Sequence, residues 1–168
     1  NGVSVYGGFA SGEASLAERN VEQNPTVLEG DIGLPGSTAD NVYHVVTGSG
    51  TNSSAVLDGF VIRGGNASAG VTNGGGLLID AGSPTLRNLV VTHNQANFLG
   101  GGALAYNGNP TFSNVTFAFN NAGSGGGFAA LNSDAAISDS EFVGNAAGNE
   151  AGGLYSSLGD PTLTDVSF

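Results

Sequence analysis

Four residue types are missing from the sequence: cysteine, methionine, tryptophan and lysine. Without cysteine the chain can form neither a disulfide nor a thiolate metal site, which suits an extracellular or cell-surface protein. No apolar run approaches the roughly 18 residues of a membrane-spanning helix, so we expect no membrane insertion by this segment. No basic, apolar signal segment precedes Asn1, and we expect a soluble mature chain or an excised fragment.

Positive charge is scarce. Only Arg19, Arg63 and Arg87 oppose fourteen carboxylates, and the formal net charge is -11. Binding to phosphate backbones or to anionic lipid requires clustered basic side chains. The composition therefore predicts no nucleic-acid partner, whereas divalent cations, neutral glycans and proteins remain as candidate partners.

Glycine is abundant, with 30 residues in 168, and part of it recurs in pairs. The pairs follow one another at steps of 26, 25 and 26 residues: Gly75-Gly76, Gly101-Gly102, Gly126-Gly127 and Gly152-Gly153. Sixteen residues after the first glycine of each pair stands an apolar residue: Val91, Phe117, Phe142 and Phe168. Three residues beyond it, in the first three repeats, stands an asparagine: Asn94, Asn120 and Asn145. These spacings indicate an internal repeat of about 25 residues.

Apolar residues between these marks align in further columns: Leu77, Ala103, Phe128 and Leu154; Leu86, Phe112, Ile137 and Leu163; Leu89, Val115, Ser140 and Val166. Within a repeat, apolar residues alternate as in a strand with one buried face. One such unit cannot bury its apolar face alone, but stacked units bury all the columns together. The sequence therefore predicts an all-β, single-stranded parallel β-helix of about five to six coils, in one domain.

The recurring polar and glycine positions have structural explanations in such a stack. An asparagine column passes amide hydrogen bonds from coil to coil and satisfies turn groups that would otherwise lack partners. We expect the paired glycines to adopt positive φ at a tight corner before each first strand, where a β-carbon would clash.

The repeat is regular over residues 74–168 and irregular over residues 1–70, where we expect expanded N-terminal coils. Residues 57–62 still align with residues 86–91. Ser15 and Glu18 have the spacing of a capping box, which predicts a short helix inserted near the N-terminus. We expect this helix to cover the end of the stack.

The motif Gly101-Gly102-Ala103-Leu104, followed by Phe117-Ala118-Phe119-Asn120, resembles the repeat of the bacterial polymorphic outer membrane protein family. Gly126-Gly127-Phe128-Ala129 with Phe142-Val143-Gly144-Asn145 is similar, although Phe128 replaces the small residue of the family pattern. The resemblance covers residues 74–168 and implies a right-handed β-helix in a surface or secreted protein, in several cases an adhesin. The motif residues of this family are architectural, so the resemblance implies no catalytic residue.

An enzymatic alternative stays open, because polysaccharide lyases and epimerases of the β-helix type also have coils of this length and a fold does not determine a function. Alignment of the coils predicts that Arg63, Asp58 and Arg87 are near neighbours, either as a site for a sugar acid or as a surface ion pair, which we favour. His44 and His93 lie in no spacing typical of a catalytic triad or a zinc site, and we interpret them as turn or surface residues.

Two acidic columns are the candidate metal site. Asp134 aligns with Asp160, and Asp139 aligns with Asp165, so that like charges stack on adjacent coils. A calcium ion would relieve their repulsion. Hydrated carboxylates without a metal are the alternative that we favour, and no other cofactor is expected.

The sequence stops at Phe168 in mid-coil, and head-to-tail stacking of such an end with a second copy would build a filament. The expected function is a non-enzymatic structural or adhesive module outside the cell, which binds itself, a glycan or a surface protein. A polysaccharide lyase or epimerase is the alternative.

Overall fold

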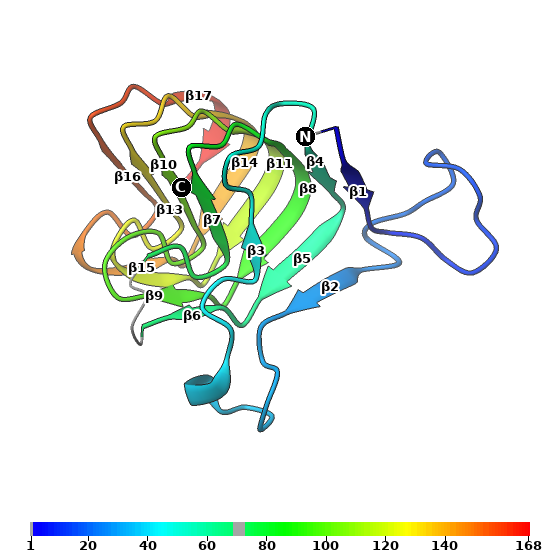
Figure 1. Cartoon of the computed structure of the whole chain (residues 1–168), viewed down its shortest axis with the longest axis horizontal. Helices are drawn as coiled ribbons and strands as arrows, with labels where there is room; N and C mark the ends of the chain where they lie inside the picture. Colours follow the sequence, from blue (N-terminus) through cyan, green and yellow to red (C-terminus); the bar gives the residue numbers. More distant parts are fainter. Residues whose placement is uncertain (1, 69–72) are drawn as a thin grey trace.

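The computed structural model describes residues 2–68 and 73–168. Their regular structure is almost entirely parallel β-sheet, wound into a solenoid of about four turns with about 26 residues per turn. Figure 1 shows the strands stacked as successive rungs around a common core. The predicted right-handed parallel β-helix is therefore the fold of this chain.

Three sheets form the walls of the solenoid. Sheet A contains β1 (Ser4–Tyr6), β2 (Thr26–Glu29), β4 (Val56–Asp58), β5 (Phe60–Arg63), β8 (Thr85–Thr92), β11 (Thr111–Ala118), β14 (Ala136–Val143) and β17 (Thr162–Ser167). Sheet B contains β3 (Val46–Thr47), β7 (Leu77–Asp80), β10 (Ala103–Tyr106), β13 (Phe128–Leu131) and β16 (Leu154–Ser157). Sheet C contains β6 (Asn66–Ala67), β9 (Gln95–Ala96), β12 (Asn121–Ser124) and β15 (Ala146–Glu150). The chain passes from sheet B to sheet A to sheet C in each full turn.

The apolar columns predicted from the sequence are the rungs of the core. Leu77 pairs with Ala103 and Ala103 with Phe128, in parallel register. Phe117 stacks on Phe142 with ring centroids 4.8 Å apart, and Phe142 stacks on Phe168 at 4.9 Å. The repeating side chains thus form one continuous core.

Ser140 interrupts an apolar column without leaving a polar group unpaired. Its hydroxyl donates to the carbonyl oxygen of Ser138 at 2.6 Å and accepts the backbone N–H of Val115 at 3.1 Å. A buried hydroxyl that both donates and accepts a hydrogen bond costs little folding free energy.

The predicted asparagine ladder is confirmed. The side-chain oxygen of Asn120 accepts the backbone N–H of Asn94 at 3.0 Å, and the oxygen of Asn145 accepts the N–H of Asn120 at 3.0 Å. The amide groups also bond to each other, with Asn94 donating to Asn120 at 3.1 Å and Asn120 to Asn145 at 3.0 Å. The ladder therefore satisfies the backbone at one corner of each coil.

The explanation predicted for the glycine pairs is wrong in one respect. Positive φ falls on the residue before the pair, for example φ 64 at Gly100 and φ 53 at Ala151. The pairs themselves are required by close approach, because a β-carbon on Gly76 would lie 2.5 Å from the carbonyl oxygen of Gly102 and 2.8 Å from the amide nitrogen of Asn94. Adjacent coils leave no room there for a side chain.

The N-terminal part departs from the repeat. Strands β1 and β2 pair with β4 and β5, and both β4 and β5 pair with β8, so together β1 and β2 supply one interrupted rung of sheet A. This arrangement gives about four full turns rather than the five to six expected. Two long connections follow these strands, residues 7–25 and residues 30–45, and we call the first of them the strap.

The short helix predicted around Ser15 is also wrong. Residues 15–18 form a single hydrogen-bonded turn, and the 3-10 helix η1 (Thr38–Asp40) lies in the second connection instead. Within the ranges given above, no helix has the length and apolar character needed to cross a membrane.

Candidate binding groove under the strap

The strap is fixed to sheet A by one arginine. Arg19 forms an ion pair with the carboxylate of Asp58 at 2.7 Å and donates to the carbonyl oxygens of Gly7 at 3.2 Å and of Asp58 at 3.3 Å. Its guanidinium lies 5.4 Å from the centre of the Tyr6 ring. These contacts hold the strap against the outer face of the sheet.

Asp58 is the buried anion of this anchor, with 0% of its surface exposed. Its carboxylate also accepts hydrogen bonds from Nε of Arg87 and Nδ2 of Asn88, each at 2.7 Å. Burial raises the pKa of Asp58, but the hydrogen bonds from Arg19, Asn88 and Arg87 and the charge of Arg19 outweigh it and hold the pKa below its ordinary value. The carboxylate is therefore a permanent anion near neutral pH.

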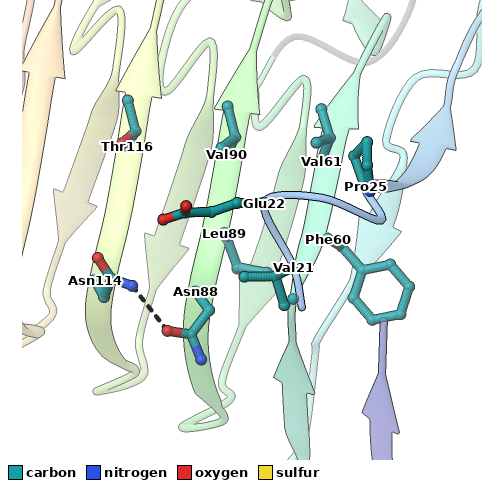
Figure 2. Close-up of a pocket in the computed structure, with 11 residues that line it drawn as sticks. Val21, Glu22, Pro25, Phe60, Val61, Asn88, Leu89, Val90, Asn114 and Thr116 are labelled. Carbon is teal, nitrogen blue, oxygen red and sulfur yellow. Dashed lines mark hydrogen bonds between the residues drawn. The ribbon is translucent and has the colours of Figure 1, made fainter. Parts of the chain in front are cut away.

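A groove of about 310 Å³ lies between the strap and sheet A. One side is formed by strap residues, and the floor by outward-facing residues of successive strands: Val21, Glu22 and Pro25; Val61, Asn88, Val90, Asn114 and Thr116. In Figure 2, Glu22 reaches from the strap toward the strand that carries Asn114 and Thr116. The groove thus combines amide and hydroxyl groups with an apolar wall and one carboxylate.

Two residues of the floor, Asn88 and Asn114, belong to a column of residues in the left-handed backbone conformation. Asn88 and Asn114 both have φ 52, and Asp139 and Asp165 have φ 50 and φ 53. Asparagine, aspartate and glycine adopt this conformation at the lowest cost, which explains why the column, from Gly59 onward, contains only these three types.

Side-chain hydrogen bonds connect the groove to the anchor. Nδ2 of Asn114 donates to Oδ1 of Asn88 at 2.8 Å, as the dashed line in Figure 2 shows, and Asn88 in turn donates to Asp58. The floor is therefore preorganised by bonds that run back to Arg19. Sequence reasoning missed this groove, although the Asn88 and Asn114 column could have indicated its floor.

The predicted cluster of Arg63, Asp58 and Arg87 is only partly present. Arg87 pairs with Asp58, but Nε of Arg63 pairs with Glu29 at 2.6 Å, and Arg19 takes its place at Asp58. Asp58 is buried, so this is not a surface ion pair. All three arginines of the sequence are thus paired with carboxylates.

Neither histidine lies in a catalytic arrangement. Nδ1 of His44 is 2.7 Å from the carbonyl oxygen of Gly74, and Nδ1 of His93 is 2.8 Å from the hydroxyl of Thr92. His93 packs against Phe119 at 5.5 Å between ring centroids. His93 and Phe119 both have φ 53, so they occupy equivalent positions in a column with a left-handed backbone.

The residues of the two acidic columns have structural roles. Oδ1 of Asp134 accepts the backbone N–H of Asp160 at 2.9 Å, while Asp139 and Asp165 occupy the left-handed column. Over residues 2–68 and 73–168, no group of three histidine, cysteine, aspartate or glutamate side chains is placed to hold a metal ion. Calcium binding by these four aspartates stays a prediction.

Comparison of the chain with models of protein families, with curated proteins and with solved structures finds no match. The resemblance to the polymorphic outer membrane protein repeat is therefore carried by the quoted motifs alone.

Proposed function

We propose that the chain is a non-enzymatic β-helix module of an extracellular or cell-surface protein that binds an uncharged glycan in the groove under the strap. The observation that carries this proposal is the pairing of all three arginines with carboxylates, beside a groove floor of amide and hydroxyl groups. An acidic sugar would meet no unpaired cationic side chain in this chain.

The composition of the groove favours a hydroxyl-rich ligand. Asn114 and Asn88 offer amide donors and acceptors, Thr116 offers a hydroxyl, and Glu22 offers a strong acceptor. Val21 and Pro25 supply apolar surface for the C–H faces of a sugar ring. A few placed polar groups beside apolar surface are typical of small-molecule sites.

The same features argue against a lyase or epimerase for acidic polysaccharides. Such a reaction needs a base near the substrate and positive charge to stabilise the carboxylate of the sugar as a proton is removed. Arg87 is bound to the buried Asp58, and Arg63 to Glu29. We therefore propose binding without cleavage.

The test is titration of the chain with a panel of neutral and uronic-acid oligosaccharides, followed by NMR chemical-shift mapping. We expect neutral oligosaccharides to bind and to shift amides of the strap and of β8 and β11. Uronic-acid oligosaccharides should neither bind in the groove nor yield unsaturated products. Binding of none of the neutral sugars, or cleavage of an acidic one, would contradict the proposal.

A matched pair of variants locates the binding. Asn114→Gly removes a floor amide, whereas Asn132→Gly removes an equivalent amide of the Asn107–Asn132 pair, outside the groove. Both residues have left-handed backbones, so glycine introduces no strain at either position. We expect Asn114→Gly to weaken binding about tenfold and Asn132→Gly to leave it unchanged.

Head-to-tail filaments stay a prediction from the sequence. Light scattering and negative-stain microscopy of the purified chain, with and without glycan, test it. Filaments would add a structural role to the binding module, and a persistent monomer would contradict the filament.

A further inference from the structure

The second connection, residues 30–45, forms one wall of another pocket on the outer face of sheet A. This pocket has a volume of about 410 Å³, compared with about 310 Å³ for the groove under the strap. Most of its lining is polar and comes from the connection and from the C-terminal ends of β2, β5 and β8: Ser37, Thr38 and Asn41; Glu29, Arg63 and His93. We call it the distal pocket.

The distal pocket and the groove under the strap share one floor. Val61 lines the groove and Arg63 lines the distal pocket, and both point outward from β5, because Ile62 between them is buried in the core. Two residues along a strand span about 7 Å. On β8, Val90 pairs with Val61 and Thr92 pairs with Arg63, so the neighbouring strand continues the same floor. Figure 2 shows Val61 and Val90 side by side, at the end of the groove toward which the strands run.

The two connections stand at opposite ends of β2. The strap ends directly before this strand, and the second connection begins directly after Glu29. Figure 1 shows them leaving the sheet at the two ends of β2. Between them, Val27 and Val90 are 41% and 38% exposed, so apolar surface lies open between two polar pockets. A ligand that extends along the strands can therefore lie under the strap at one end and against the second connection at the other.

The distal pocket offers hydrogen-bonding groups that the protein leaves open. Nε of Arg63 is bound to Glu29, but Nη1 and Nη2 of Arg63 donate no hydrogen bond within the described part of the chain. Ser37 precedes η1, yet its hydroxyl does not cap that helix. The ring of His93 packs against Phe119, which is 56% exposed on the next coil. Donors, acceptors and an aromatic surface therefore lie together at this end of the floor.

The charge of the distal pocket favours an uncharged ligand. The residues that line it include two carboxylates, Glu29 and Asp31, and one guanidinium, that of Arg63. A phosphate or uronate would meet more negative than positive charge there. An arginine paired with a carboxylate presents N–H donors beside an oxygen acceptor, and a sugar hydroxyl can bind both because it donates and accepts.

We propose that one linear, uncharged oligosaccharide occupies both sites and runs along the strands of sheet A, from the groove under the strap to the distal pocket. This inference rests on the proposed function, because it extends the same glycan site. It identifies the ligand as a chain of sugars rather than a single sugar, and it assigns Arg63 and Ser37 to the far end of that chain. Occupation of two linked sites makes the second binding event intramolecular, so long chains bind more tightly than short ones.

Isothermal titration calorimetry with neutral oligosaccharides of increasing length tests the proposal. The probes are the cello-, malto- and xylo-oligosaccharide series, from the monosaccharide to the hexasaccharide. We expect the series that binds to gain at least about tenfold in affinity from its shortest to its longest member. In NMR spectra, long members should shift the amides of Ser37 and Arg63 together with those of the groove, whereas short members should shift the groove amides alone.

Two substitutions in the distal pocket locate the far end of the chain. Arg63→Lys removes the Nη donors and retains the positive charge beside Glu29. We expect it to weaken the binding of long chains about tenfold and to leave short chains unchanged, because short chains fill only the groove. Ser37→Ala should weaken long chains about threefold. Its matched control is Ser11→Ala, which removes an exposed hydroxyl of the strap outside both sites and should have no effect.

Failure of this proposal and failure of the proposed function give different results. Groove binding that does not strengthen with chain length, and that Arg63→Lys leaves unchanged for every chain, would overturn the extended site and keep the glycan groove. An equal loss for short and long chains in Arg63→Lys would show that the variant disturbs the groove, and it would contradict a separate distal pocket. No binding at any length would overturn both the extended site and the proposed function.

Discussion

The two parts of this chain use the same fold in different ways. From β7 onward, nearly every corner and rung repeats, and most of the fully buried large side chains lie there. Before β7 the rungs are interrupted, and several apolar residues such as Val3, Val5 and Val27 are exposed. The groove forms where the strap, which belongs to this earlier part, lies over β8 and β11 of the repeated part. Repetition stabilises the stack, and the interruption of the repeat creates the groove under the strap.

The largest loss of stability is expected when the centre of the asparagine ladder is removed. Asn120→Ala deletes the acceptor of the buried Asn94 N–H and the amide bonds to Asn94 and Asn145. We expect a loss of about 4 kcal/mol in the free energy of unfolding, measured with urea. Asn20→Ala in the strap, where the exposed side chain accepts the N–H groups of Glu22 and Gln23, should cost less than about 1 kcal/mol. Similar losses for both variants would contradict the comparison.

The next largest loss of stability is expected where the backbones of adjacent coils approach each other closely. A β-carbon on Gly76 would meet the backbone of Gly102, which is held by the coil beyond it. Gly76→Ala should therefore cost about 2–3 kcal/mol. In Gly148→Ala the new β-carbon meets nothing within 4 Å, so this variant of the same repeat region should be nearly neutral. Thermal or urea unfolding of both variants checks this prediction. Equal losses of stability would indicate that the repeat region tolerates no substitution, whether or not the new β-carbon meets another atom.

The strap anchor predicts a smaller effect in the irregular part. Arg19→Met leaves Asp58 with Arg87 and Asn88 as partners, and we expect a loss of about 1–2 kcal/mol at neutral pH. Glu29→Gln, which breaks the exposed pair with Arg63, should cost at most about 1 kcal/mol. An Arg19 variant no weaker than the Glu29 variant would show that the strap is not anchored as described.

The same anchor sets a pH dependence. Because the pKa of Asp58 is lowered by folding, its contribution to stability is present above its ordinary value of 3.8 and is lost as the pH falls through the lower folded value. Asp58→Asn should remove this component and flatten the acid limb of unfolding free energy against pH. An unchanged acid limb would contradict the assigned role of Asp58.

The smallest expected effect is a gain. Leu158 has φ 59 and is 80% exposed, in the left-handed column that contains Asn107 and Asn132 in the preceding coils. Leu158→Asn relieves backbone strain and extends the amide pair between Asn107 and Asn132. We expect stabilisation of about 0.5–1 kcal/mol by urea unfolding. Destabilisation would show that Leu158 has a packing role.

The fold of the regular part could be predicted from the sequence because the constant spacing of its residues indicates which of them stack on one another. A constant step between Asn94, Asn120 and Asn145 predicts that they stack, and their hydrogen bonds confirm it. It was harder to predict which residue at each corner has positive φ. The residue before the glycine pair has positive φ, whereas the pair itself is required by the close approach of adjacent coils.

The structure of the irregular part was harder to predict from the sequence because its contacts are not repeated. Arg19 reaches Asp58 across 39 positions, and no periodic signal marks that pair. The capping-box pattern at Ser15 and Glu18 predicted a helix, yet it forms one turn. The carboxylate of Glu18 accepts the N–H groups of Ala14 and Ser15, which lowers its pKa, but so short a segment cannot propagate a helix.

Native-state hydrogen exchange tests the division between the repeated coils and the irregular N-terminal part most directly. Amides of the repeated coils, including those of Asn94 and Asn120, should exchange only through global unfolding. Amides of the strap and of the second connection, residues 30–45, should exchange through local opening, many times faster. Uniform protection along the chain, or stronger protection before β7 than after it, would contradict the account.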